Sequence, residues 1–271
     1  MAQNNKKLAI VAGNGELTTI LAKSAREQGF HTYAIAITDE AKQRLDDVCT
    51  KVYSFAPGEV SKILECVKKE LINQIVFIGK IPKINFLRNL HKLDWLAIKN
   101  LYRFRNFHDD SFHNAVADFL KEHEIDILPQ TMFLRELFIE KEILSKRKPT
   151  LEERADIQYG YDAAKKIAGL DIGQTVVVKN KMIVAIEAIE GTDEAIKRGC
   201  VLSKSEVVVV KVAKPNQDER FDIPVIGGHT LETLAKNGGG VLAFEAGRTI
   251  VASKEEVIKV ADKYKICLIA I

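Results

Sequence analysis

The chain has 271 residues, which is long enough for two modest domains or one large one. Hydrophobic residues make up 46% of it and charged residues 28%, a balance that is ordinary for a globular protein and excludes a disordered chain. The net charge of +3 is too small to predict nucleic-acid binding from charge alone.

The expected compartment is inferred from two features that we do not find in the sequence, an apolar signal region and a membrane-spanning run. The start, residues 1–7, is polar, and no apolar run approaches the roughly 20 residues that cross a bilayer, so we expect a cytoplasmic protein without a signal peptide. The four cysteines are scattered without a Cys-x-x-Cys pair, which indicates neither a zinc knuckle nor a redox dithiol.

The first half of the chain alternates short apolar runs with amphipathic segments, which is typical of a βαβ arrangement. The expected order is strand 8–12, glycine turn 13–15, helix 16–28, strand 31–37, helix 60–71, strand 74–78, helix 111–122 and strand 125–128. Right-handed crossovers would bring the turn at 13–15 and Lys80 to one carboxyl edge of a parallel sheet. We predict a Rossmann-like domain over residues 1–135.

The second half is richer in strands. Thr150 and Glu153 have the spacing of a capping box, so a helix is expected from 151 to 167. After it we expect a hairpin of strands 174–179 and 182–188 around an Asn180-Lys181 turn, helix 194–198, strand 206–212, helix 230–237, strand 241–246, helix 254–264 and strand 266–271. This order predicts an α/β domain with a mixed sheet over residues 136–271.

The stretch 211–228, KVAKPNQDERFDIPVIGG, is the strongest candidate for a site. It follows the buried strand around Val207–Val210, and five charged side chains leave the sheet together: Lys214, Asp218, Glu219, Arg220 and Asp222. Such a loop suits a phosphorylated ligand with a metal ion, and a solvated loop with local ion pairs is the open alternative.

Two further loops carry suitable groups at strand ends. Glu190-Gly191-Thr192-Asp193 offers a hydroxyl and acids for a hydroxyl, phosphate or divalent metal, while helix capping by Thr192 or Asp193 explains the same residues. Arg248 offers a forked cation to a phosphate or carboxylate, and an ion pair with Glu245 or Glu190 is its competing role.

Gly13-Asn14-Gly15 lies between a strand and a helix, where backbone N–H groups can approach an anion. As a nicotinamide fingerprint it is weak, because Thr18 stands at the third glycine position, although Asp39 could bind a ribose. A tight structural turn is the simpler alternative. Lys80 can reach a phosphate or remain solvated.

The segment 80–107 mixes cations with aromatic residues. It suits RNA, acyl chains with an anionic head group or a membrane surface, or an ordinary amphipathic helix pair. The nearby His108, Asp109, Asp110 and His113 resemble a ligand cluster, but a helix cap explains the two acids better.

Several motifs together resemble one known family, the UDP-2,3-diacylglucosamine diphosphatases of lipid A biosynthesis, of the type unrelated to calcineurin-like metallophosphatases. The resemblance runs nearly end to end and is carried by Leu8-Ala-Ile-Val-Ala-Gly13-Asn-Gly-Glu-Leu17, Ile78-Gly-Lys80, Leu128-Pro-Gln-Thr131, Leu170-Asp-Ile-Gly-Gln-Thr175, Glu187-Ala-Ile-Glu-Gly-Thr-Asp193, Val212-Ala-Lys-Pro-Asn-Gln-Asp218, Arg220-Phe-Asp-Ile-Pro224 with Gly227, and Glu245-Ala-Gly-Arg248.

The resemblance implies hydrolysis of the pyrophosphate in UDP-2,3-diacylglucosamine to UMP and 2,3-diacylglucosamine 1-phosphate (lipid X). It implies a divalent cation such as Mg²⁺ or Mn²⁺, a site between two domains, and an essential aspartate at Asp222. The resemblance leaves open a peripheral contact with the inner membrane and a homo-oligomer. It does not imply a nucleic-acid partner.

We therefore expect Asp222 to act as a metal ligand or as the base that orients water, with Asp218 as a second catalytic carboxylate and Glu190 near the metal. The substrate-binding residues that we expect share polar side chains or backbone groups at strand ends: Gly13, Asn14, Gly15, Lys80, Glu187, Gly191, Thr192, Asp193, Lys214, Arg220 and Arg248. A nicotinamide-dependent oxidoreductase and an RNA-binding module remain the alternatives.

Overall fold

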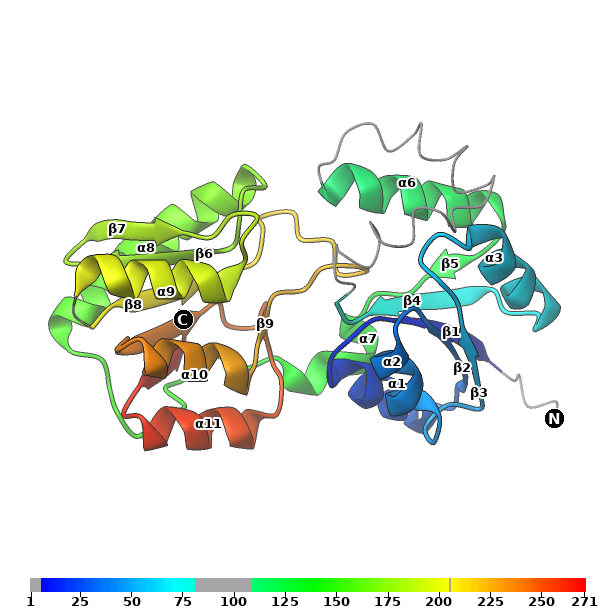
Figure 1. The fold of residues 1–271 in the computed structure, drawn as a ribbon, viewed down its shortest axis with the longest axis horizontal. Helices are drawn as coiled ribbons and strands as arrows, with labels where there is room; N and C mark the ends of the chain where they lie inside the picture. Colours follow the sequence, from blue (N-terminus) through cyan, green and yellow to red (C-terminus); the bar gives the residue numbers. More distant parts are fainter. Residues whose placement is uncertain (1–5, 81–108, 205) are drawn as a thin grey trace. The chain divides into compact units, whose positions relative to one another are not determined.

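The computed structural model describes residues 6–80, 109–204 and 206–271. The chain divides into two compact α/β units (Figure 1). Unit 1 comprises Met1–Leu134 together with Asp218–Phe221, and unit 2 comprises Arg135–Gln217 together with Asp222–Ile271. The expectations for His108 and for residues 81–107 lie outside the described residues.

Unit 1 contains a five-stranded sheet in which all neighbours are parallel, in the order β3-β2-β1-β4-β5. Its strands are β1 (Lys7–Ala12), β2 (His31–Ala36), β3 (Lys51–Ser54), β4 (Gln74–Ile78) and β5 (Asp126–Ile127). Its helices are α1 (Leu17–Glu27), α2 (Asp39–Leu45), α3 (Val60–Lys69), α6 (Asp109–Glu122) and α7 (Thr131–Leu134). The predicted parallel-sheet fold is confirmed.

Local chemistry explains where these elements begin. Residues 8–12 of β1 are buried because both faces of a parallel sheet are covered, so the strand is apolar throughout. The sequence reading missed α2, whose amino end is capped by Thr38: its hydroxyl accepts the Ala41 N–H at 3.2 Å. Asp39 is therefore the first residue of a helix, and not the end of a strand as expected.

Unit 2 contains a mixed five-stranded sheet in the order β12-β10-β8-β6-β7, as predicted. Its strands are β6 (Thr175–Lys179), β7 (Met182–Ile186), β8 (Val208–Lys211), β10 (Val241–Phe244) and β12 (Cys267–Ala270), and β9 (Val225–Ile226) pairs separately with β11 (Ile250–Val251). Its helices are η3 (Arg135–Leu137), α8 (Leu151–Gly169), α9 (Thr192–Ser203), α10 (Gly228–Lys236) and α11 (Lys254–Lys263).

Two local predictions in unit 2 are confirmed at the level of hydrogen bonds. Thr150 and Glu153 form both bonds of a capping box at the start of α8. Asn180 and Lys181 turn the β6–β7 hairpin with φ angles of 52° and 55°. The carboxylate of Asp156 stabilises this left-handed turn by accepting both N–H groups, at 2.9 and 2.6 Å.

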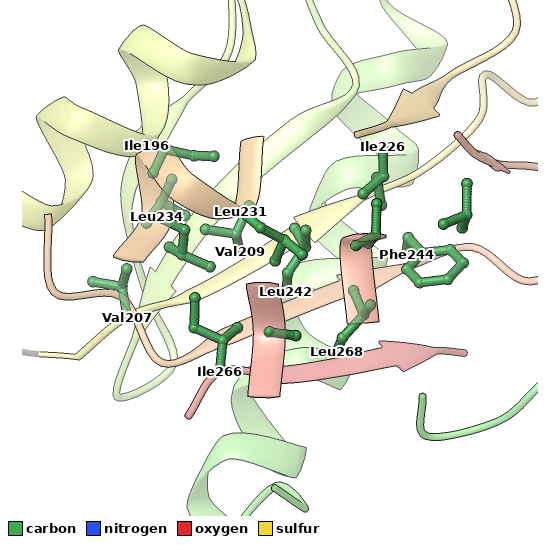
Figure 2. Close-up of a cluster of buried hydrophobic side chains, with 14 of the residues drawn as sticks. Ile196, Val207, Val209, Ile226, Leu231, Leu234, Leu242, Phe244, Ile266 and Leu268 are labelled. Carbon is green, nitrogen blue, oxygen red and sulfur yellow. The ribbon is translucent and has the colours of Figure 1, made fainter. Parts of the chain in front are cut away.

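The main core of unit 2 lies between its sheet and the helices α9, α10 and α11. In Figure 2, Leu231 and Leu234 of α10 lie over Val209 of β8 and Leu242 of β10. Helix α8 covers the opposite face of the sheet, and Gly160 permits its close approach, since a Cβ there would stand 2.7 Å from Val210 Cγ2. Packing on both faces fixes the strand ends that carry the candidate site.

The bounds of two helices in unit 2 differ from the expected ones. Helix α9 spans Thr192–Ser203 where residues 194–198 were expected, and α10 begins at Gly228 where Thr230 was expected. The N-cap residue of each helix is a glycine, Gly191 or Gly227, with no side chain to cap it, so the usual sequence signal for a helix start is absent. Within the described ranges, no helix is both long and apolar enough to span a bilayer.

Candidate functional site

The strand register of unit 2 gathers polar residues at one edge of the sheet. Lys211, at the carboxyl end of β8, pairs with Thr175 at the start of β6 and with Phe244 at the end of β10. The Glu187 N–H donates to the Thr175 carbonyl at 2.9 Å, which places the end of β7 at the same edge. Ligands of α/β sheets bind at such an edge.

A chain of polar contacts runs across this edge. Lys211 Nζ donates to Thr192 Oγ1 at 2.8 Å, and Thr192 Oγ1 donates to Glu187 Oε1 at 2.7 Å. Lys211 is only 9% exposed, so its charge is held at the site in a largely desolvated position. The capping role considered for Thr192 is wrong, because Gly191 precedes α9 with no side-chain cap. The sequence reading did not single out Lys211.

Five buried side-chain oxygens in unit 2 have no hydrogen-bond partner among the described residues: the hydroxyls of Thr175 and Thr249, and the carboxylate and amide oxygens Glu187 Oε2, Asp193 Oδ1 and Gln174 Oε1. Leaving such an acceptor unsatisfied costs about 1–3 kcal/mol, so these atoms suit a ligand that brings hydroxyl or N–H donors or a hard cation. The other carboxylate oxygen of Asp193 lies 3.4 Å from His229 Nε2, a pairing that the sequence reading did not find.

Asp222 is held by two glutamines of unit 2. Gln174 Nε2 donates to Asp222 Oδ2 at 3.3 Å, and the side-chain amide of Gln217 donates to the Asp222 carbonyl. Gln174 directly precedes β6, and its carbonyl accepts the Val212 N–H at 2.9 Å. The candidate catalytic carboxylate is thereby attached to the polar edge of the sheet.

The expected cations Lys214 and Arg248 lie together. Lys214 is 7% exposed, and its Nζ lies 2.5 Å from Asp171 Oδ1. Arg248 Nη2 donates to the Lys214 carbonyl at 3.2 Å. The ion pairs that competed with this role of Arg248 are not found among the described residues, where Glu245 pairs with Lys165 at 3.0 Å and Glu190 with Arg198 at 2.6 Å.

Asp218 and Arg220 belong to unit 1 although they lie between residues of unit 2 in sequence. Arg220 donates to both oxygens of Asp218, at 2.9 Å from Nε and 2.7 Å from Nη2. These bonds hold the pKa of Asp218 below its usual range and raise the pKa of Arg220. The pair thus neutralises a carboxylate that was expected to share catalysis.

The glycine turn of unit 1 is tied to the residue that follows β4. The Asn14 and Lys80 backbones exchange hydrogen bonds of 2.8 and 2.9 Å, as predicted from their common edge. A Cβ on Gly13 would stand 2.5 Å from the Lys80 carbonyl oxygen, which explains the glycine. Asn14 Oδ1 is buried and has no partner within the described part of the chain.

The N–H groups of the turn are engaged within unit 1. Gly13 donates to the Ile78 carbonyl at 2.9 Å, and Gly15 donates to Glu40 Oε1 at 3.2 Å. A carboxylate thus already occupies the amino end of α1, where an anion was expected to bind. Thr18 Oγ1 donates to the Gly15 carbonyl at 2.8 Å, which gives this departure from the nicotinamide fingerprint a structural role.

A Mg²⁺ or Mn²⁺ ion would have to be held by few protein ligands. The described residues contain no group of three or more His, Cys, Asp or Glu side chains that could hold a metal. Mg²⁺ commonly binds through one or two carboxylates with substrate phosphates and water, and the unpartnered Glu187 Oε2 and Asp193 Oδ1 are oxygen donors of that kind. The residues fit an ion that binds together with a phosphorylated substrate.

Solved structures offer only remote likenesses. The ADP-bound biotin carboxylase domain of a thermophilic 2-oxoglutarate carboxylase is 15% identical with a TM-score of 0.28, over 71% of this chain and 32% of that chain. N5-carboxyaminoimidazole ribonucleotide synthetase from Thermotoga maritima is 17% identical with a TM-score of 0.26, over 67% of this chain and 41% of that chain. Likenesses this weak carry no argument.

The sequence comparisons are more specific. The protein named UDP-2,3-diacylglucosamine pyrophosphatase LpxI from Caulobacter vibrioides is 29% identical over 266 residues, which cover 95% of this chain and 94% of that protein. The model of the LpxI N-terminal domain matches residues 7–137, and that of the LpxI C-terminal domain matches residues 140–269. With both domains present in order, the chain belongs to the LpxI family.

Proposed function

We propose that this protein hydrolyses the pyrophosphate bond of UDP-2,3-diacylglucosamine to UMP and 2,3-diacylglucosamine 1-phosphate. The named activity of the Caulobacter relative and the family membership support the reaction. The observation that carries it is the polar edge of unit 2, where Lys211, Thr192 and Glu187 form one hydrogen-bonded chain.

A pyrophosphate diester resists water because its negative oxygens repel a nucleophile. Catalysis therefore requires cations at the phosphoryl oxygens and a carboxylate that orients water in line with the leaving group. Lys211, Lys214 and Arg248 are the cations that we assign to the phosphates, with Thr192 as a donor to phosphate or sugar. The low exposure of Lys211 and Lys214 favours strong charge–charge interactions.

Asp222 is our candidate for the carboxylate that orients water. Its contact with Gln174 fixes one carboxylate oxygen, and no described residue donates a hydrogen bond to the other, which can accept a proton. Asp218 is a weaker candidate for a base, since Arg220 lowers the pKa of its carboxyl group. We therefore propose only a secondary role for Asp218, as a residue that holds the loop next to Asp222 in place.

We propose Mg²⁺ or Mn²⁺ as the cofactor, and such an ion would supply charge neutralisation at the phosphates. Asp222 and Glu190 are the ligands proposed from the sequence, and Glu187 and Asp193 are added because each has a buried oxygen without a partner in the described ranges. Glu190 would have to leave Arg198 to bind a metal.

Unit 1 is proposed to bind part of the nucleotide sugar through its glycine turn. Asn14 Oδ1 can accept a ligand donor, and Lys80 can reach a phosphate. A phosphate at Gly15 N–H would replace the Glu40 carboxylate, which is an exchange of one anion for another. A cytoplasmic location, contact with the inner membrane and a homo-oligomer remain parts of the proposal.

The comparisons do not favour the two alternatives. A nicotinamide enzyme would need a third glycine at Thr18, whose side chain instead bonds the turn, and Asp39 at a strand end, whereas it begins α2. The RNA-binding alternative rests on residues 80–107, of which 81–107 lie outside the described ranges.

The decisive experiment is incubation of the purified protein with UDP-2,3-diacylglucosamine, with Mg²⁺, with Mn²⁺ and with EDTA. Mass spectrometry should find UMP and 2,3-diacylglucosamine 1-phosphate in equal amounts when the metal is present. Hydrolysis in ¹⁸O-water would show which phosphorus the water attacks. Intact substrate under all metal conditions, with a folded protein, would refute the proposal.

A further inference from the structure

A short segment of the second half of the chain folds with the first half. Residues Asp218–Phe221 cluster with unit 1, whereas Gln217 before them and Asp222 after them belong to unit 2. The chain therefore passes between the units at the peptide bonds on both sides of this segment. The second of these bonds directly precedes the candidate catalytic aspartate.

Backbone contacts fix the segment in unit 1. The Gln130 N–H donates to the Glu219 carbonyl at 2.9 Å, and Gln130 Nε2 donates to the Phe221 carbonyl at 3.0 Å. Thr131 Oγ1 adds a 2.7 Å bond to Glu219 Oε2. Gln130 is 5% exposed, so one buried residue holds two carbonyls of the segment, including the one bonded to the Asp222 nitrogen.

The ring of Phe221 adds an aromatic contact to these hydrogen bonds. It stacks on His113 of α6 with centroids 4.5 Å apart and an interplanar angle of 5°, and it lies 5.1 Å from the ring of Phe77 in β4. The Arg220 guanidinium lies 5.4 Å from the Phe221 ring centroid. A solvated loop needs no such set of contacts, and they restrict both the ring and the backbone that carries it.

On the other side of the same peptide bond, Asp222 is fixed within unit 2 by Gln174 and Gln217. Consecutive Cα atoms across a trans peptide are about 3.8 Å apart, and the planar C–N bond that joins the two residues does not rotate freely. A displacement of the Phe221 carbonyl therefore moves the Asp222 nitrogen with it, which strains the contact of the Asp222 side chain with Gln174.

We propose that Phe221 is a positioning residue: its contacts with His113 and Phe77 anchor the backbone next to Asp222 and thereby restrict where the Asp222 carboxylate stands. The proposal rests on the proposed function, because it assigns Asp222 to catalysis. Misplacing a catalytic group by about 1 Å can cost roughly 100-fold in rate, which is the size of effect that a lost anchor would produce.

The first test compares Phe221→Ala with Phe221→Tyr and with the control Phe55→Ala. Phe55 forms a stacked pair with Tyr53 in unit 1, with ring centroids 6.5 Å apart, so its removal deletes a similar contact away from the segment. We expect Phe221→Ala to lower kcat roughly 10- to 100-fold with KM within about twofold, and Phe221→Tyr to keep most of kcat. Equal kcat values for Phe221→Ala and Phe55→Ala would overturn the proposal.

The second test asks whether Phe221 acts through Asp222. Adding Phe221→Ala to an Asp222→Asn enzyme should cause no further loss of kcat, because the carboxylate that it positions is already gone. A loss in the double variant as large as in the Phe221→Ala enzyme would show that the ring acts independently, and would contradict the proposal.

A third measurement separates this inference from the proposed function. Hydrogen exchange of peptides covering residues 217–224 should accelerate in Phe221→Ala and not in Phe55→Ala, whether or not the substrate is cleaved. Unchanged exchange in these peptides would overturn the anchoring role. Absent hydrolysis by the unmodified protein, with accelerated exchange in the variant, would refute only the assigned reaction.

Discussion

The carboxyl edges of the two sheets are built in different ways. In unit 1 the edge consists mainly of backbone, with the Gly13 turn tied to Lys80 through main-chain hydrogen bonds. In unit 2 the edge consists of side chains, and Lys211 reaches Glu187 through Thr192. A backbone edge recognises shape, whereas a side-chain edge supplies charge, so the difference is in line with our proposal that unit 1 binds part of the substrate and unit 2 carries the chemistry.

The largest effect expected from this comparison is at Asp222. Asp222→Asn keeps the size and the contact with Gln174 but cannot accept a proton, and we expect kcat to fall about 10²- to 10⁴-fold. Steady-state kinetics would measure the loss. The matched variant Asp218→Asn should lose far less, since Arg220 already binds that carboxylate. Equal losses would break the distinction between the two acids.

The next effect concerns charge at the edge of unit 2. Lys211→Met removes a buried ammonium and its bond to Thr192, and we expect kcat/KM to fall roughly 10- to 100-fold, as for a lost charged hydrogen bond. The control is Lys179→Met at the end of β6, since β6 begins at the polar edge and runs away from it. A similar loss in both variants would argue against a local role for Lys211.

A smaller effect is expected from the backbone edge of unit 1. Gly13→Ala would place a Cβ 2.5 Å from the Lys80 carbonyl oxygen and should lower the free energy of unfolding by about 1–3 kcal/mol. Gly227→Ala is the control, because its backbone is extended at φ −130° and no atom lies within 4 Å of the added Cβ. Urea denaturation of both variants would measure the difference.

The smallest effect is the pH dependence of the Asp218–Arg220 pair. Because Arg220 holds the pKa of Asp218 below its usual 3.8, the pair stabilises the folded state above that pH and loses its contribution as pH falls through the lowered value. Solvent screens a pair that is partly exposed, so Asp218→Asn should cost less than about 1 kcal/mol at pH 7. Urea denaturation should show this gap close as the pH falls below 3.8, and a constant gap would contradict the assignment.

Local signals made much of the fold predictable. Apolar runs and glycine turns indicated β1, β2 and β4, and the capping box of Thr150 marked the start of α8. The hairpin at Asn180 was readable because its turn chemistry is contained in two neighbouring residues. Helix α9 was predicted to start two residues too late because Gly191 gives no capping signal.

The candidate site was less readable, since its contacts join residues distant in sequence. Gln174 and Asp222 are 48 positions apart, and nothing in either local pattern indicates the other. The pairing of Asp193 with His229 was missed for the same reason, because these residues too are far apart in sequence. The glycine turn likewise gives no sign in the sequence that the Gly15 N–H group already donates to the Glu40 carboxylate, 25 positions away.

The crossing of Asp218–Phe221 into unit 1 has a practical consequence for dissecting this protein. A fragment that ends at Leu134 would lack the side chain that covers His113 and Phe77, while the complementary fragment would present Phe221 to water. Cutting the gene at its apparent midpoint thus damages both halves. A fragment design that preserves each half would graft the four residues back onto the first.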